Sequence, residues 1–256
     1  MNCITVSLKS GVRTLQFNNP KKKNVFNVET FRKIAEILTK DVSNDDVSGT
    51  ILTGTGDYFT SGSDLSLALN HMNNVEGAIG ESLSAYKEMT ETMIRYPKLL
   101  AALVNGPAIG IGATMCGLCD LVYATENATF TTPFVKLGIS IEACASVLFP
   151  KIMGSAKANE MLLLGRTFTA KEALQANLVC RVIPQADIES FKEDLHKKIG
   201  ELNVAGFINN KKLMKESTQQ ELLETFLREN IYIEKSLKSE SFMKSMLEFA
   251  KRKKNA

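Results

Sequence analysis

One stretch constrains this sequence more than any other: residues 103–120, where closely spaced glycines interrupt an apolar run that then resumes at helical spacing. The pattern predicts a strand, a tight loop and a helix. Gly106, Gly110 and Gly112 allow the backbone to turn sharply and to lie close to a bound group. A helix beginning at Ile111 has first N–H groups without a partner inside it, so they can hold an anion. A packing turn between a strand and a helix would carry the same glycines, and this stretch alone leaves both interpretations open.

Spacing and composition exclude several classes of protein. The glycines follow G-x-x-x-G-x-G, which is not the dinucleotide fingerprint G-x-G-x-x-G. The net charge of +3 is smaller than the charge of the basic run at 251–254, so the rest of the chain is close to neutral. With 7% aromatic residues and no Trp, no basic face interleaved with aromatics is visible, and we expect no nucleic-acid partner. No apolar segment is long enough to span a membrane, and we expect no membrane partner.

Cysteine and histidine usage argues against a metal site or a hydrolytic triad. The five Cys are an odd number scattered over 256 residues, which predicts reduced thiols in an intracellular compartment. Cys116 and Cys119 have redox-pair spacing, but they lie inside the apolar run and we expect buried structural thiols. His71 and His196 accompany no recognisable nucleophile elbow. Three methionines are expected to pack in a core or pocket: Met72, Met89 and Met93.

Hydrophobic periodicity predicts an α/β body followed by helices. Alternating apolar and polar residues predict a hairpin of strands at 4–8 and 12–17, and helical periodicity predicts a helix at 28–40. Further strands are predicted at 47–52, 98–104, 120–124, 129–131 and 178–182, with helices at 76–95, 156–164, 170–175, 187–202, 206–216 and 220–251. A 44% hydrophobic composition suffices to build a large core without disulfides.

Six segments together resemble the crotonase (enoyl-CoA hydratase/isomerase) superfamily over nearly the whole chain, most of all its peroxisomal-type Δ3,Δ2-enoyl-CoA isomerases. They are Pro-Lys-Lys-Lys-Asn at 20–24, Thr-Gly-Thr-Gly-Asp-Tyr at 53–58, Ser-Gly-Ser-Asp-Leu at 61–65, Val-Asn-Gly-Pro-Ala-Ile-Gly at 104–110, Thr-Pro at 132–133 and Phe-Pro-Lys-Ile-Met at 149–153. The resemblance implies a spiral of ββα turns in residues 1–200, with the acyl-CoA site. It implies a helical region in residues 201–256 that builds a trimer.

The resemblance also implies an oxyanion hole. In that family two backbone N–H groups hold the thioester oxygen, and the matching residues here are Ser63 and Ile111. Donors already aimed at an oxygen that becomes an enolate stabilise its charge without reorganising, so the identity of their side chains matters little. Asp64 is expected to cap or anchor its loop rather than to act as a base. The residues implied to bind substrate are Ser61, Gly62, Asp64, Leu65, Gly110, Lys22 and Asn24.

The acid/base residue distinguishes members of this family. Hydratases carry two glutamates, at positions that are Thr114 and Phe134 here, so both hydratase carboxylates are absent. The isomerase subgroup has its glutamate where this chain has Glu142, among apolar neighbours. A carboxylate in apolar surroundings has a raised pKa, which suits removal of a proton from C2 and its return at C4. A surface glutamate at a helix start, favoured by the helix dipole, is the alternative interpretation.

We therefore expect an isomerase that converts 3-enoyl-CoA to 2-trans-enoyl-CoA in the β-oxidation of unsaturated fatty acids. The resemblance implies no metal and no cofactor beyond the CoA of the substrate. Another enolate reaction of the superfamily, such as dienoyl isomerisation, is the enzymatic alternative. The other alternative is a non-catalytic acyl-CoA-binding or interaction domain, like those of chromodomain Y-like proteins, which carry aspartate where Glu142 stands.

Assembly and compartment are further expectations. The helices predicted at 206–251 carry more apolar surface than an appended tail could leave in water, so we expect burial against the body or between subunits of a homotrimer or a dimer of trimers. The apolar residues are Phe207, Ile208, Leu213, Met214, Leu222, Leu223, Phe226, Leu227, Ile231, Phe242, Met243, Met246, Leu247 and Phe249. No targeting signal is visible in the chain, and the resemblance alone suggests a peroxisome or mitochondrion.

Overall fold

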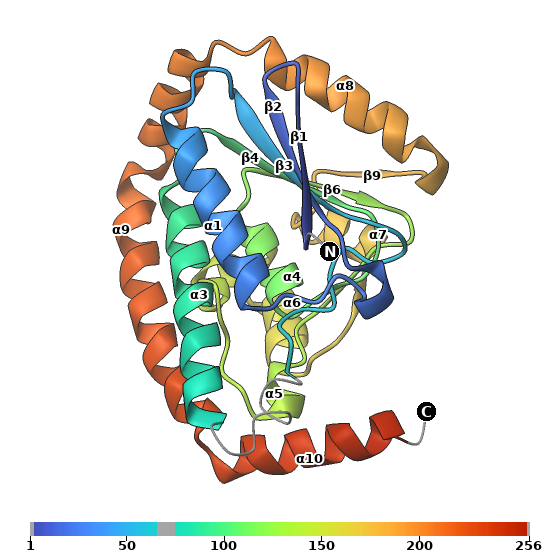
Figure 1. The fold of residues 1–256 in the computed structure, drawn as a ribbon, viewed down its shortest axis with the longest axis vertical. Helices are drawn as coiled ribbons and strands as arrows, with labels where there is room; N and C mark the ends of the chain where they lie inside the picture. The colour runs from blue at the N-terminus through green and yellow to red at the C-terminus, as the bar shows by residue number, and fades with distance from the viewer. Residues whose placement is uncertain (1–2, 66–74, 255–256) are drawn as a thin grey trace.

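The structure, a computed structural model, describes residues 3–65 and 75–254. The sequence-based predictions for His71 and Met72 fall outside these residues. Within them, a six-stranded sheet has the order β1-β2-β3-β4-β6-β9, and a three-stranded sheet has the order β5-β7-β8. Figure 1 shows α1, α3 and α9 on one side of the larger sheet and α8 on the other.

The larger sheet is parallel apart from its first strand. The hairpin of β1 and β2 is antiparallel, as predicted, and each later neighbour pairs in parallel. The strands are β1 Ile4–Lys9, β2 Val12–Phe17, β3 Gly49–Gly54, β4 Leu99–Val104, β6 Leu121–Thr125 and β9 Arg181–Ile183. Strand β4 is buried along its whole length, and alternate residues enter the two hydrophobic cores that lie on opposite faces of the sheet.

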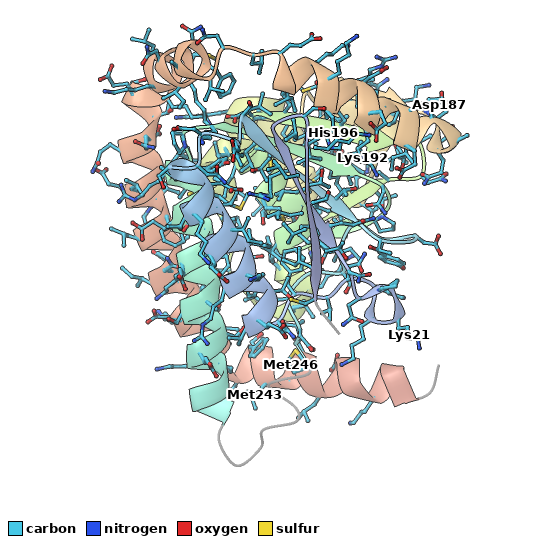
Figure 2. All side chains as sticks on the ribbon, turned by 45° about the horizontal axis from the view of Figure 1, so that its top comes forward. Lys21, Asp187, Lys192, His196, Met243 and Met246 are labelled. Atoms are coloured by element: carbon cyan, nitrogen blue, oxygen red, sulfur yellow. The ribbon has the colours of Figure 1, made fainter. Side chains whose placement is uncertain are left out.

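Helices cover both faces. Helices α1 (Val28–Val42) and α3 (Val75–Arg95) pack against the larger core, where Met89 and Met93 are buried as expected. Helix α8 (Ile188–Gly200) covers the other face and carries His196 toward the sheet (Figure 2). The His196 Nε2 atom lies 2.9 Å from the Thr14 hydroxyl, and burial lowers the pKa of this ring. His196 is therefore a core residue.

The glycine-rich stretch forms the predicted strand, loop and helix, but its elements are short. After β4 come β5 (Ala108–Ile109), α4 (Ile111–Thr114) and the 3-10 turn η2 (Met115–Leu118). A Cβ on Gly106 would lie 2.0 Å from the Asp57 carbonyl oxygen, and one on Gly112 would lie 2.4 Å from Thr60 Cγ2. These two glycines serve packing within the chain, whereas Gly110 faces the cavity described below. The packing interpretation therefore holds at Gly106 and Gly112, and the binding of an anion beside Gly110 stays a prediction.

The remaining short elements follow this stretch. Strands β7 (Thr129–Thr131) and β8 (Phe168–Thr169) complete the smaller sheet. Strand β8 was not predicted, and the strand predicted at 178–182 lies instead at β9, because residues 178–180 form the turn that leads into it. The other elements are η1 Pro20–Lys22, α5 Phe134–Leu137, α7 Ala170–Gln175 and η3 Gln185–Asp187.

Two predicted helix boundaries were wrong. Helix α6 runs from Ala145 to Leu162, with Pro150 inside it and a kink at Gly154, so it begins well before the predicted residue 156. The helices predicted at 206–216 and 220–251 are instead α9 (Val204–Leu237) and α10 (Glu240–Lys254). The break falls at Ser239, whose hydroxyl accepts a hydrogen bond from the Phe242 N–H group and caps α10.

Helix α9 is tied to the body by a partly buried ion cluster. The Lys211 Nζ atom donates to Asp120 Oδ2 at 2.6 Å and to the Lys98 carbonyl at 2.7 Å, and Lys215 Nζ lies 2.8 Å from Asp120 Oδ1. Asp120 also accepts from the Leu100 N–H group at the start of β4. Because each charge has partners, the cluster fixes the orientation of α9 relative to the sheet.

The cysteines form no disulfide among the described residues, and Cys116 lies in the hydrophobic core. Burial raises the pKa of the Cys119 thiol to about 12, which makes it unreactive at neutral pH. The described part of the chain contains no cluster of three or more His, Cys, Asp or Glu side chains that could hold a metal ion. Nor does any helix in that part have the length and apolarity needed to cross a membrane.

Candidate active site

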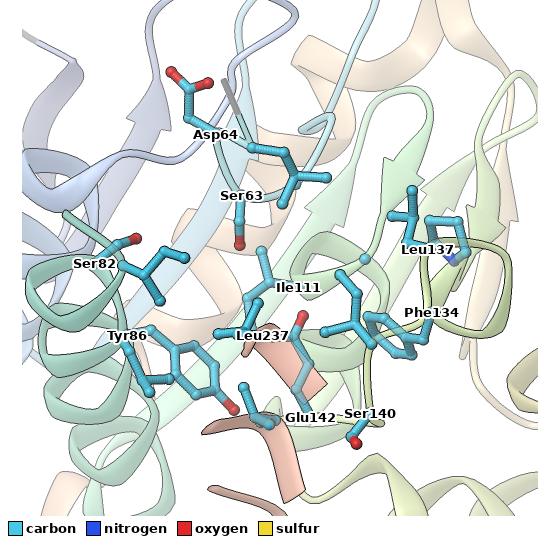
Figure 3. Close-up of a pocket in the computed structure, with 18 of the residues that line it drawn as sticks. Ser63, Asp64, Ser82, Tyr86, Ile111, Phe134, Leu137, Ser140, Glu142 and Leu237 are labelled. Atoms are coloured by element: carbon cyan, nitrogen blue, oxygen red, sulfur yellow. The ribbon is translucent and has the colours of Figure 1, made fainter. Parts of the chain in front are cut away.

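A cavity of about 140 Å³ lies where segments from both ends of the chain meet. The loop after β3 lines it with Ser61, Gly62, Ser63, Asp64 and Leu65, and the start of α4 adds Gly110 and Ile111. Helix α3, the loop after α5, and helices α9 and α10 supply the other walls (Figure 3). The division of the chain into residues 1–200 and 201–256 stays a prediction, because side chains from both ranges surround this one cavity.

The two loops that are predicted to form the oxyanion hole lie directly against each other. The Thr60 N–H donates to the Pro107 carbonyl at 3.2 Å, and the Ile109 N–H donates to the Thr60 carbonyl at 3.0 Å, as in a short parallel pair of strands. Gly62 has a φ of 88°, and a Cβ there would lie 2.7 Å from the Ile109 carbonyl oxygen. Only glycine tolerates both conditions, so Gly62 allows this close approach of the loops.

Two backbone N–H groups lie at the wall of the cavity, those of Ser63 and Ile111. Phe26 exchanges hydrogen bonds with the Gly62 carbonyl and the Asp64 N–H, so the Ser63 N–H points away from Phe26. Ile111 is the first residue of α4, and its N–H has no acceptor inside the helix. Both residues line the cavity, and Figure 3 shows them close together on one side of it. This arrangement can hold an oxyanion.

Glu142 reaches the same cavity from the loop between α5 and α6 (Figure 3). Burial raises the pKa of this carboxyl to about 8, and the negative charge of Glu229 acts in the same direction. A surface glutamate stabilised by a helix dipole would have an ordinary or lowered pKa. Glu142 is half-buried, and a pKa close to neutral is what a general base requires.

The turn that carries Glu142 has an unusual backbone. Ala143 and Cys144 have φ values of 56° and 61°, in the left-handed region that non-glycine residues avoid. The Ala143 N–H donates to the Tyr86 hydroxyl at 2.8 Å, and the Cys144 N–H donates to Glu229 Oε2 at 2.7 Å. Tyr86 comes from α3 and Glu229 from α9, so distant helices hold this turn.

In this chain, no carboxylate occupies the two positions where hydratases are expected to carry glutamates. Phe134 occupies one of them and Thr114 the other. Phe134 lines the cavity and is buried. Thr114 is fully buried, and its hydroxyl donates to the Gly110 carbonyl at 3.3 Å. Neither side chain can activate water by taking its proton.

Two predicted substrate-binding residues lie away from the cavity. The Asn24 amide donates to the Thr55 carbonyl at 2.9 Å and to the Tyr58 carbonyl at 2.7 Å, and its oxygen accepts from the Asn19 N–H. This side chain shapes the loop before α1. Lys22 is exposed in η1, and its carbonyl is 3.5 Å from the Ser61 hydroxyl. A role for either residue in binding substrate stays a prediction, and neither lines the cavity.

The buried polar residues of α9 were not predicted from the sequence. Glu229 and Asn230 are polar residues on the buried stripe of α9, between Phe226 and Ile233. A glutamate at a core position of an amphipathic helix was the available signal, because such a carboxylate needs buried partners. Nothing in the sequence showed which turn those partners belong to. Cavity-lining residues that were also not predicted include Ser82, Tyr86, Leu237 and Phe242.

The comparisons with known proteins agree with this architecture. Residues 7–256 match the enoyl-CoA hydratase/isomerase family. The solved structure of an enoyl-CoA hydratase/isomerase from Pseudoalteromonas atlantica T6c has a TM-score of 0.89 at 30% identity, over 98% of this chain and 97% of that one. The chain is a member of the enoyl-CoA hydratase/isomerase family and has the crotonase fold.

Two curated relatives bear more specific names. The mouse protein named enoyl-CoA delta isomerase 3, peroxisomal, is 36% identical over 99% of this chain and 80% of its own length. The rat protein named enoyl-CoA delta isomerase 2 is 45% identical over 73% of this chain. That match covers 48% of the rat protein, so the chain spans about half the length of that relative.

Proposed function

We propose that the protein is a Δ3,Δ2-enoyl-CoA isomerase acting in the β-oxidation of unsaturated fatty acids. The observation that carries this proposal is the placement of Glu142 in the cavity that Ser63 and Ile111 also line. The names of the mouse and rat relatives support it. The reaction is a proton transfer within one substrate, and we propose that it uses no cofactor beyond the CoA of that substrate.

The proposed reaction balances with one base. The Glu142 carboxylate takes a proton from C2 of 3-enoyl-CoA, and the electron pair of that C–H bond moves into the thioester to give a dienolate. The Ser63 and Ile111 N–H groups stabilise the negative oxygen. The protonated Glu142 then returns the proton to C4, the double bond forms between C2 and C3, and the thioester carbonyl is restored. The pKa of about 8 suits both the removal and the return of the proton.

Hydration is disfavoured by the same cavity. Adding water to a 2-enoyl-CoA needs a group that activates the water, and hydratases of this family use a pair of carboxylates for this purpose. Phe134 fills one of those positions with a ring, and Thr114 fills the other. We propose for the same reason that dienoyl isomerisation, which calls for further carboxylates, is not the main activity.

An assay of the purified protein with two substrates tests this assignment. We expect isomerisation of 3-hexenoyl-CoA, followed by absorbance of the product enoyl thioester, to exceed hydration of crotonyl-CoA by at least about a hundredfold. Comparable turnover of the two would contradict the roles given to Thr114 and Phe134. Tight binding of acyl-CoA without isomerisation at any chain length would instead favour the alternative function, a non-catalytic acyl-CoA-binding domain.

We propose a homotrimer or a dimer of trimers as the assembly. Four apolar residues of these helices are buried within the chain, as expected for burial against the body: Leu222, Phe226, Phe242 and Met246. Other apolar side chains of α9 and α10 stay exposed: Leu213, Met214, Leu227, Ile231, Tyr232, Met243 and Leu247. Figure 2 shows Met243 and Met246 on α10. Light scattering at micromolar concentration should give a mass of three or six chains, and a monomeric mass would contradict the proposal.

We propose a peroxisome or mitochondrion as the compartment. The printed name of the mouse relative includes the word peroxisomal, which describes that protein, and it is the support for this proposal. Immunodetection of the native protein in fractionated cells should find it with organelle markers. Recovery in the cytosolic fraction alone would contradict it.

A further inference from the structure

Glu229 is a second buried carboxylate beside the cavity, and the proposed reaction does not use it. Its side chain comes from α9 and is 5% exposed. It accepts three hydrogen bonds: from the Cys144 N–H at 2.7 Å, from the Ser146 N–H at 3.1 Å and from the Ser146 hydroxyl at 2.5 Å. Glu229 does not line the cavity, so it has no direct access to a substrate there.

These hydrogen bonds hold the strained turn that follows Glu142. Two successive non-glycine residues with positive φ, Ala143 and Cys144, are costly and persist only where surrounding contacts fix them. Glu229 binds the second of these residues and the start of α6 at once. The Tyr86 hydroxyl binds the first. Loss of the Glu229 contacts would therefore release the backbone that aims Glu142 into the cavity.

Glu229 also places a negative charge next to Glu142. Repulsion between two carboxylates disfavours the ionised form of each and so makes Glu142 a stronger base. The three donated hydrogen bonds favour the ionised form of Glu229, although burial acts the other way and raises the pKa of Glu229. The other titratable or charged groups that couple to this pair or line its cavity are Tyr86, Cys144, Arg228 and Asp64.

Of those four groups, none supplies the negative charge that Glu229 supplies. Burial keeps the pKa of Tyr86 and of Cys144 above their ordinary values, so both stay protonated where Glu142 titrates. Arg228 carries a positive charge, not a negative one. Figure 3 shows the Asp64 carboxylate at the far side of the cavity, pointing away from Glu142.

We propose that Glu229 is a positioning residue for the base Glu142, fixing the strained turn behind it and, by its charge, strengthening it as a base. The proposal rests on the proposed function. Glu229 acts through its charge and through its hydrogen bonds to the turn, and it exchanges no proton with the substrate.

The test is the pH dependence of kcat/KM for isomerisation of 3-hexenoyl-CoA in Glu229→Gln. Because the base must be ionised, kcat/KM rises with pH through the pKa of Glu142 and then reaches a plateau. Removing the neighbouring charge should move this rise to lower pH by about one unit. It should also lower kcat on the plateau by at least about tenfold, because the base is weaker and its turn is held less firmly.

Two further variants separate charge from position. Glu229→Asp keeps the charge but shortens its reach, so the rise should stay near the wild-type pH while kcat falls. This variant also carries the test if Glu229→Gln does not fold, and a wild-type kcat for it would then overturn the proposal. Glu224→Gln is the matched control, because Glu224 lies on the same helix but is exposed, and it should change neither quantity.

An unshifted rise in Glu229→Gln, with or without a lower kcat, would overturn the proposal, because a purely structural role does not move the pKa of the base. Should the wild-type protein isomerise no 3-enoyl-CoA, the proposed function fails on its own. The titration of Glu142, followed by NMR of protein carrying ¹³C-labelled glutamate and assigned with Glu142→Gln, then still measures the effect of Glu229. An equal pKa for Glu142 in wild type and Glu229→Gln would overturn the proposal by that route.

Discussion

The two sides of the cavity differ in the kind of chemical group that they present: backbone N–H groups on one side and a carboxylate side chain on the other. The proposed oxyanion side consists of backbone N–H groups in two loops, and hydrogen bonds near these groups join the loops to each other. The base side consists of one carboxylate on a strained turn that Tyr86 and Glu229 hold from distant helices. The difference teaches where each side is vulnerable. Changes to the backbone should damage the first, and changes to side chains should damage the second.

The largest effect expected on the oxyanion side comes from Ile111→Pro. Proline is tolerated at the first position of a helix, where Ile111 stands, but it has no N–H. Loss of one preorganised donor should lower kcat by about a hundredfold or more. Steady-state isomerase kinetics measure it, with Ile111→Val as the control that keeps the N–H and should stay within a few-fold of wild type. A folded proline variant with unchanged kcat would place the donor elsewhere.

A second effect concerns stability on the base side. The pKa of Glu142 is raised from 4.5 to about 8 by folding, so the folded state holds a proton that the unfolded state releases between these values. Stability therefore falls as the pH rises through this window. Glu142→Gln does not titrate, so relative to wild type it should gain at least about 1 kcal/mol of unfolding free energy between pH 5 and pH 9.

Urea unfolding at the two pH values measures this gain. The matched control is Glu224→Gln, an exposed glutamate whose replacement should show no such pH-dependent gain. The difference in unfolding free energy between Glu142→Gln and wild type could instead be the same at pH 5 and pH 9. That result would mean that the Glu142 carboxyl is not desolvated in the folded protein.

The smallest effect expected is that of Ser63→Ala. The proposed oxyanion donor at this residue is the backbone N–H, which alanine retains, so kcat should stay within about threefold of wild type. The same kinetic assay measures it. A hundredfold loss would show that the serine hydroxyl takes part directly, and the proposed division between backbone and side chains would then fail.

The contrast between the two sides of the cavity also explains how much of each could be predicted from the sequence. The oxyanion loops are local motifs in which glycine is needed at particular positions, and Gly62 and Gly110 indeed have positive φ values beside the cavity. Hydrophobic periodicity likewise predicted the hairpin, the buried strands of the sheet and helices α1 and α3. These features depend on residues that are neighbours in the chain.

The base side could be predicted only in part, because its partners are distant in sequence. The resemblance pointed to Glu142. The strained turn beside it is held by Tyr86, which is 57 residues from Ala143, and by Glu229, which is 85 residues from Cys144. Asn24 illustrates the same limit from the side of a local motif. It matches a family motif and was predicted to bind substrate, yet its amide is used by backbone groups of a neighbouring loop. A motif identifies a residue, but only its partners show what the side chain does.

The most direct test of the proposed mechanism is the turnover and affinity of Glu142→Gln measured on the same preparation. The substitution keeps the size of the side chain but removes the group that accepts the C2 proton. We expect isomerisation of 3-hexenoyl-CoA to fall by at least about a hundredfold, while the Kd for hexanoyl-CoA changes by less than about threefold. A folded variant that keeps near-normal turnover would contradict the assignment of Glu142 as the base.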